Sequence, residues 1–273
     1  MNMTLRGLTR QAAAALANLA RDSTDNRVSI VSAGGIPPLL ALMSSGSGGA
    51  KENTIEAIVQ LANKSPSNQE AIAESGGIPL LVNSLTTAGA SKENTSAITQ
   101  CSLAASAIWR LSENHPRNKV AVAEAGAIGP LVAMLNNNSN EMCTNAAGAL
   151  STLSTENVDN QAAIARTGAI APLCTLVREG SSETKEQSAA ALWSLSLDNA
   201  PNKATIAKLG GIEPLVGLLV SGASDTAGEY AAGALCSLAS KHSENRTTIA
   251  KRLVALLNGK AVDRGVRVLT ALA

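Results

Sequence analysis

The sequence predicts an all-α protein, an α–α superhelix of stacked helical repeats, and three observations lead to that prediction. One phrase recurs from Asn26, Asn68, Asn118, Asn160 and Asn202, with a shortened copy from Asn245, at steps of 42, 50, 42, 42 and 43 residues. A fixed period of this size is typical of repeat arrays. Within each copy the apolar residues recur at helical spacing. Hydrophobic residues make up 45% of the chain but aromatics only 1%, with no Phe, which suits closely packed Ala- and Leu-rich helices.

Taken in order, the chain begins with a strong helix former over residues 4–22, which resembles the last helix of a unit. Each following unit opens with a short segment such as 26–34, where the Asn is a suitable N-cap. A Gly then ends the segment, and a residue without Cβ can take the positive φ of a helix stop. These glycines are Gly34, Gly76, Gly126, Gly168 and Gly210.

A second segment follows, with a Pro in its first turn at Pro38, Pro130, Pro172 and Pro214, where a missing N–H does no harm. The third segment is longer and Ala-rich, as in 186–196. No unit can bury its apolar faces alone, so stacking of the units must supply the core.

Two units depart from the pattern. In residues 68–115 the third segment starts at Lys92 but reaches its last Leu only at Leu111, which predicts a third helix longer by about two and a half turns at 3.6 residues per turn. A bulge or break near Ser102 is the alternative. The last unit lacks the Gly-Ile-x-Pro link, so residues 249–253 should run straight on, toward an apolar helix that ends at Ala273. We expect a fragment of a longer array, or ends that something else covers.

Net charge, cysteine spacing, hydrophobic runs and histidine positions point to no nucleic-acid, membrane, metal or catalytic function. The net charge of +1 gives no electrostatic support for a nucleic-acid or anionic membrane partner. Four cysteines lie in apolar stretches without a C-x-x-C pair, which favours reduced packed thiols over a disulfide or zinc framework. No secretory segment or apolar run of transmembrane length is present. His115 and His242 occupy equivalent turns of different units, so we expect no catalytic site, no metal site and no cofactor.

The phrase N-x-x-x-[IV]-x-x-x-G-[GA]-I-x-P-L-[LV]-x-L-[LM], followed by A-x-A-L-x-x-L-[AS], resembles the armadillo repeat over nearly the whole chain. The resemblance implies three helices per repeat and a concave groove, lined by the third helices, that commonly binds extended peptides. It implies a single array over 1–273: a partial repeat 4–22, repeats at about 26–65, 68–115, 118–157, 160–199 and 202–242, and a truncated repeat 245–273.

The third segments carry two polar rows that we name the polar stripe. One row precedes the last Leu of each segment and the other lies seven residues earlier, on the same helix face. The candidate groove residues are Gln11, Asn18, Asn53, Gln60, Arg110, Asn145, Thr152, Gln187, Ser194, Tyr230 and Ser237. Amides and hydroxyls could pair with a peptide backbone, at about three residues per repeat if helices lie about 8–10 Å apart. A merely solvated helix face is the alternative.

The predicted function is therefore a non-enzymatic scaffold that binds a protein or peptide segment, extended or helical, without nucleic acid, membrane insertion or a small-molecule substrate. An importin-alpha-like transport receptor is one alternative. That class pairs each groove Asn with a Trp four residues earlier, and here the Trp positions hold Ala14, Glu56, Ser106, Gly148, Ala190 and Gly233. Trp109 and Trp193 directly precede the groove positions Arg110 and Ser194, and they should pack between repeats rather than serve as exposed anchors. The substrate-binding part of an armadillo-type ubiquitin ligase is the other alternative. We expect a cytoplasmic location, or also a nuclear one.

Overall fold

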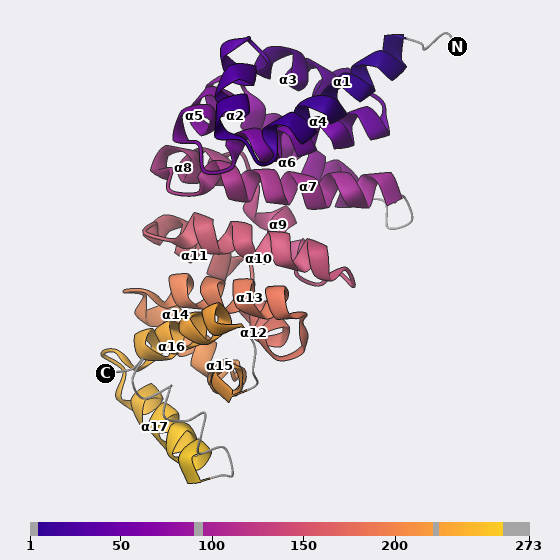
Figure 1. Cartoon of the computed structure of the whole chain (residues 1–273). Coiled ribbons are helices and arrows are strands. Elements are labelled where there is room, and N and C mark those ends of the chain that lie inside the picture. Colours follow the sequence, from indigo (N-terminus) through magenta and orange to yellow (C-terminus); the bar gives the residue numbers. More distant parts are fainter. Residues whose placement is uncertain (1–4, 90–94, 221–223, 259–273) are drawn as a thin grey trace. The chain divides into compact units, whose positions relative to one another are not determined.

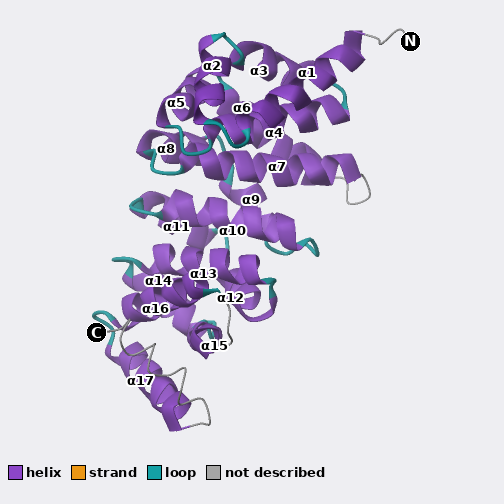
Figure 2. Cartoon of the chain, in the orientation of Figure 1, coloured by secondary structure: helices purple, strands orange, loops and turns teal. Residues whose placement is uncertain are grey.

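The computed structural model describes residues 5–89, 95–220 and 224–258, which form seventeen helices and no strand (Figures 1 and 2). The chain divides into two compact units, residues 1–134 and 135–273, and each is described by itself. The first unit contains α1 (Leu5–Ala20), α2 (Thr24–Ser32), α3 (Ile36–Ser45), α4 (Gly48–Ala62), α5 (Pro66–Glu74), α6 (Gly77–Gly89), α7 (Thr95–Ser112), α8 (Pro116–Glu124) and α9 (Ile128–Met134). The second contains α10 (Asn140–Ser154), α11 (Val158–Arg166), α12 (Ile170–Glu179), α13 (Ser182–Ser196), α14 (Ala200–Lys208), α15 (Ile212–Val220), α16 (Asp225–Ala239) and α17 (Ser243–Asn258).

The helices follow a cycle of two short helices and one long helix, which confirms the all-α prediction. Third helices pack on one another, α1 on α4 and α4 on α7 in the first unit, and α10 on α13 and α13 on α16 in the second. Within each unit a second helix packs along the third helix after it: α3 on α4 and α6 on α7 in the first unit, and α12 on α13 and α15 on α16 in the second. The core is made of leucine, isoleucine and alanine, and side chains such as Leu61, Ile72 and Leu150 are fully buried. The predicted single array and its repeat limits stay a prediction.

The glycine stops are confirmed. Gly34, Gly76, Gly126, Gly168 and Gly210 all have φ between +76° and +89°, directly after a first helix. An L-residue pays a steric penalty in this left-handed region and glycine does not, so glycine fits the turn into the second helix.

The predicted N-cap role of the repeated Asn is wrong. The caps lie three residues earlier, as Ser23 and Asn157 do, and their side chains accept the backbone N–H of Asn26 and Asn160. The repeated Asn instead stands in the first turn, and its Nδ2 donates to the carbonyl seven residues before it, at the end of the preceding third helix. The six acceptors are the oxygens of Leu19, Leu61, Leu111, Leu153, Leu195 and Leu238, at 2.7–3.1 Å. The Asn therefore satisfies a carbonyl that a helix end leaves without an intrahelical partner.

In three repeats the residue after the Asn ties the first helix to the third helix of the same repeat. Gln69 donates to the carbonyl of Ala62 at 3.2 Å and to that of Arg110, in the next third helix, at 2.8 Å. In the second unit Gln161 donates to the Ser194 carbonyl at 2.9 Å, and Lys203 Nζ to the Ser240 carbonyl at 3.1 Å. Each of these buried side chains donates to a backbone carbonyl and so helps to hold the helices together, although the buried Gln69 Oε1 has no hydrogen-bond partner among the described residues.

The extra sequence of the repeat at residues 68–115 lies partly in its second helix and not only in its third. α7 is continuous through Ser102, so the alternative of a break is wrong. Its described part has 18 residues against 15 for α4, and because the residues directly before Thr95 lie outside the described ones, the predicted gain of about two and a half turns stays a prediction. The second helix α6 takes up part of the extra sequence, with 13 residues against 10 in α3. The predicted start at Lys92 lies outside the described residues.

At the other end, α17 runs without interruption through residues 249–253, as predicted. The expected apolar helix ending at Ala273 lies outside the described residues. Within the described ranges, no single helix is long and apolar enough to cross a membrane; the pair α2–α3, bent by 81°, meets that test only when its two helices are counted together.

Candidate functional site

The polar stripe lies on helices that are direct neighbours within each unit. In the first unit it falls on α1 (Gln11, Asn18), α4 (Asn53, Gln60) and α7 (Arg110); in the second it falls on α10 (Asn145, Thr152), α13 (Gln187, Ser194) and α16 (Tyr230, Ser237). These third helices run side by side in Figure 1. Each unit therefore presents a row of polar side chains that crosses from one third helix to the next.

In the first unit the stripe is open to solvent but partly engaged in internal hydrogen bonds. Gln11 and Asn18 are exposed, whereas the stripe residues of α4 are half-buried. Asn53 Nδ2 donates to the Arg10 carbonyl at 3.1 Å, which ties α4 to α1. Gln60 Nε2 donates to Glu56 Oε1 at 2.8 Å. Each amide keeps its carbonyl oxygen as an acceptor, so these residues can still bind a peptide N–H.

Arg110 brings the one charge of the stripe. Its guanidinium carbon lies 4.7 Å from the centroid of the Trp109 ring, within the range of a cation–π contact. Its Nη1 is 3.8 Å from the Glu113 carboxylate, with both side chains about one third exposed. Such a pair contributes about 0–1 kcal/mol.

In the second unit two stripe residues lie below the surface. Ser194 is 5% exposed and Ser237 8% exposed. Ser194 Oγ is 2.6 Å from Ser154 Oγ and donates to the Ala191 carbonyl at 3.1 Å, so it serves the packing of α13 on α10. Among the described residues, Ser237 Oγ has no hydrogen-bond partner. The accessible part of the stripe therefore consists of Asn145, Thr152, Gln187 and Tyr230, which are half-buried.

A third polar row lies one residue before the N-terminal row of the stripe, the row of Gln11, Asn53, Asn145, Gln187 and Tyr230, and joins adjacent third helices. The Glu52 carboxylate accepts a hydrogen bond from Ser96 of α7. In the second unit Thr144 Oγ1 lies 2.8 Å from Thr184 Oγ1, and Ser224 donates to the Glu186 carboxylate at 2.6 Å. Sequence reasoning missed this row, although its members are polar in every unit: Arg10, Glu52, Ser102, Thr144, Glu186 and Glu229.

Trp193 packs between two adjacent repeats of the second unit, as predicted. Its ring centroid is 6.0 Å from that of Tyr230, with the planes tilted by 42°. A Cβ built on Gly233 would lie 2.7 Å from the Trp193 ring, so the indole of α13 sits directly on the glycine of α16. One of the positions that lack a Trp is therefore covered by the Trp of the preceding third helix.

The titratable groups of the described residues suit structure rather than catalysis. Burial raises the pKa of the Cys101 and Cys174 thiols to about 11, so both are protonated at neutral pH. His115 and His242 act as helix N-caps, and the Nδ1 of each accepts a backbone N–H at 3.3 Å. Over residues 5–89, 95–220 and 224–258, no group of three His, Cys, Asp or Glu side chains could hold a metal ion.

Comparisons with known proteins agree with this architecture. The family model described as "Armadillo/beta-catenin-like repeat" matches residues 115–155 and 157–197. No curated protein matches the chain. Among solved structures, an engineered protein shares 26% identity at a TM-score of 0.83; the match covers 99% of this chain and 66%, just under two thirds, of that one.

Two designed proteins extend the comparison. A designed armadillo repeat protein in complex with the peptide (KR)4 is 23% identical, with a TM-score of 0.72 over 84% of this chain and 92% of that one. A protein described as a computationally designed armadillo repeat protein for modular peptide recognition is 21% identical, with a TM-score of 0.72 over 87% of this chain and 100% of that one. At these identities the likeness shows the fold. Residues 115–155 and 157–197 match the armadillo repeat, and the chain has the fold of armadillo-repeat proteins, without assignment to a subfamily.

Proposed function

We propose that the chain is a non-enzymatic scaffold that binds an extended or helical segment of a protein partner along the polar stripe. One observation carries the proposal: neighbouring third helices present half-buried amides and hydroxyls in register, namely Asn53 and Gln60 in the first unit and Asn145, Thr152, Gln187 and Tyr230 in the second. Half-buried side chains are held in place by their neighbours yet still reach a ligand. The peptide complex of a designed armadillo protein supports this mode of binding.

The chemistry of the stripe favours recognition of backbone over side chains. A carboxamide offers both donors and acceptors, as does the backbone of an extended peptide. Helices packed about 8–10 Å apart would meet a ligand about every three residues. Because Ser194 and Ser237 are buried, Gln187 and Tyr230 carry the contacts on α13 and α16 in this proposal. The absence of a Trp–Asn pair at the groove positions argues against an importin-alpha-like receptor, and the proposed location is cytoplasmic or nuclear.

Panning an unbiased peptide library against the purified chain tests the proposal. The test variant is Asn145→Arg with Gln187→Arg, which adds bulk and charge to the stripe on α10 and α13. The matched control is Ala162→Arg with Ala204→Arg, on exposed positions of the first helices α11 and α14. Peptides that bind the parent and the control but not the test variant would support the stripe as the binding surface.

Two results count against the proposal. Selection of no peptide would reject the binding function, and equal binding by both variants would place the site elsewhere. Circular dichroism of each variant confirms that a loss of binding is not a loss of fold.

A further inference from the structure

α1 carries an apolar face that the described residues leave uncovered. Its members are Leu8, Ala12, Ala15, Leu16 and Leu19, and their spacing places them on one side of the helix. Leu8 is 48% exposed and Leu19 55% exposed. We call these five residues the α1 apolar face.

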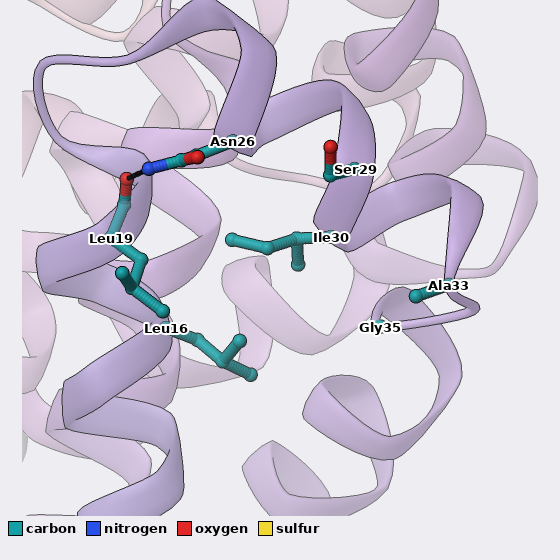
Figure 3. Close-up of a pocket in the computed structure, with 7 residues that line it drawn as sticks. All are labelled: Leu16, Leu19, Asn26, Ser29, Ile30, Ala33 and Gly35. Atoms are coloured by element: carbon teal, nitrogen blue, oxygen red, sulfur yellow. Dashed lines mark hydrogen bonds between the residues drawn. The ribbon is translucent and has the colours of Figure 1, made fainter.

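Part of this face forms a pocket with the next two helices. Figure 3 shows Leu16 and Leu19 of α1 beside Ile30 of α2, around a pocket of about 330 Å³. Asn26, Ser29, Ala33 and Gly35 complete its lining. None of the seven lining residues is buried, although three of them are large and apolar.

The equivalent positions of the other third helices are covered. Alignment on the last Leu relates the α1 apolar face to Ala50, Thr54, Ala57, Ile58 and Leu61 of α4, which are at most 2% exposed. On α13 the equivalents are Thr184, Ser188, Ala191, Leu192 and Leu195, and all five are fully buried. On α16 they are Ala227, Ala231, Ala234, Leu235 and Leu238, at most 1% exposed.

The helix that lies along these third helices is in each case the second helix of the same repeat. α3 packs along α4, α12 along α13 and α15 along α16. Among the described residues, no second helix takes that place on α1, which packs on α4, a third helix, and on α2, a first helix. The α1 apolar face therefore continues a packing surface whose covering element is seen three times elsewhere in the chain.

Those three covering helices share one chemistry. They have nine or ten residues, begin with Ile and carry a Pro in the first turn. The buried residues of α3 and α12 recur at positions i, i+3, i+4 and i+7, as Ile170, Leu173, Cys174 and Val177 do in α12, and α15 repeats the first three of these positions with Ile212, Leu215 and Val216. The face that such a helix presents is apolar and uncharged, which matches the five uncharged residues of the α1 apolar face.

We propose that the α1 apolar face is an interaction surface for one amphipathic helix with aliphatic residues at i, i+3, i+4 and i+7. The helix would lie along α1 as α12 lies along α13, and would close the pocket over Leu16, Leu19 and Ile30. Gln11 and Asn18 project from another side of α1, so this surface is separate from the polar stripe. Burial of exposed leucine from water supplies the driving force.

A covalent graft tests the proposal without depending on the affinity of a short free helix. A copy of residues 168–181, which contain α12 and its flanks, replaces residues 1–5 and so directly precedes Arg6. The junction is chosen because alignment of Leu19 with Leu195 places Arg6 at the position of Ser182, the residue that follows this segment in the chain. The matched control carries Leu173→Asp and Val177→Asp in the copied segment only. All chains carry Cys236→Ser, the copied segment carries Cys174→Ala so that the graft adds no thiol, and a second set carries Leu19→Cys as a probe of accessibility.

We expect the graft to raise the melting temperature by at least about 5 °C and to slow maleimide labelling at Leu19→Cys at least tenfold, because it buries the face. The aspartate control should show neither effect. Equal melting temperatures and labelling rates for graft and control would overturn the proposal. Light scattering supplies a second check: a dimer of the ungrafted chain that Leu19→Asp converts to a monomer would assign the face to a second copy and overturn it too.

Discussion

The hydrogen bond from each repeated Asn to the preceding third helix gives a prediction that can be worked out from the structure. Asn118 is 3% exposed, and its Nδ2 donates to the Leu111 carbonyl at 2.7 Å and, more weakly, to that of Gln69 at 3.4 Å. Asn118→Ala removes one good hydrogen bond, of about 1 kcal/mol, and leaves a buried carbonyl without a partner, at about 1–3 kcal/mol. We expect a total loss of roughly 2–4 kcal/mol in the free energy of unfolding.

Urea unfolding followed by circular dichroism measures this loss. With a slope of about 2–3 kcal/mol per molar urea, the midpoint should fall by about 1 M. Arg117→Ala is the matched control on the same helix turn, since its side chain is 88% exposed and its ion pair with Glu70 spans 3.7 Å. That change should cost under about 0.5 kcal/mol. The reasoning is refuted if the two variants unfold at the same midpoint, or if Asn118→Ala matches the parent.

Four further predictions follow from local geometry and burial. Gly168→Ala should cost about 1–2 kcal/mol, because φ there is +89° while nothing lies within 4 Å of an added Cβ; an unchanged urea midpoint would contradict a backbone origin. Gly233→Ala should cost about 1–3 kcal/mol and shift the Trp193 fluorescence, because its Cβ would lie 2.7 Å from the indole; an unshifted spectrum would contradict that packing. In the folded chain the exposed Cys236 should react with a thiol reagent while Cys101 does not, and equal labelling would count against the burial. Burial raises the pKa of the Cys101 thiol to about 11, from about 8.5 in the unfolded chain. The stability that the buried neutral thiol contributes is therefore present below about pH 8.5 and is lost as the pH rises to about 11. Cys101→Val should reduce this loss of stability at alkaline pH.

Much of the fold could be predicted because the determinants are local. Helix periodicity, the Pro in the first turn and the Gly at positive φ each act through the backbone of their own segment, and the structure confirms the five glycine stops. The role of the repeated Asn could not be predicted the same way. An Asn near a helix start suits an N-cap, and only the approach of the preceding helix end shows that Asn26 donates to Leu19 instead.

Which residues of the polar stripe are exposed could not be predicted from the sequence, because the exposure of a side chain depends on how closely the neighbouring helices approach it. Ser194 and Gln187 belong to one predicted stripe on one helix, yet the short Ser194 side chain is covered by α10 while Gln187 reaches the surface. The extra residues of the longer unit likewise went partly into α6, because the second helix could be lengthened without disturbing the buried end of α7 at Leu111. The polar stripe itself stays a prediction.

Site-specific photo-cross-linking tests the central claim, binding along the third helices, most directly. A photoreactive phenylalanine analogue replaces Thr152, on the third helix α10, or Ala162, on the first helix α11, and each chain is irradiated with a peptide selected by panning. The proposal predicts cross-links to the peptide from position 152 and none from position 162. Cross-links from position 162 alone would contradict it and place the binding surface on the first helices.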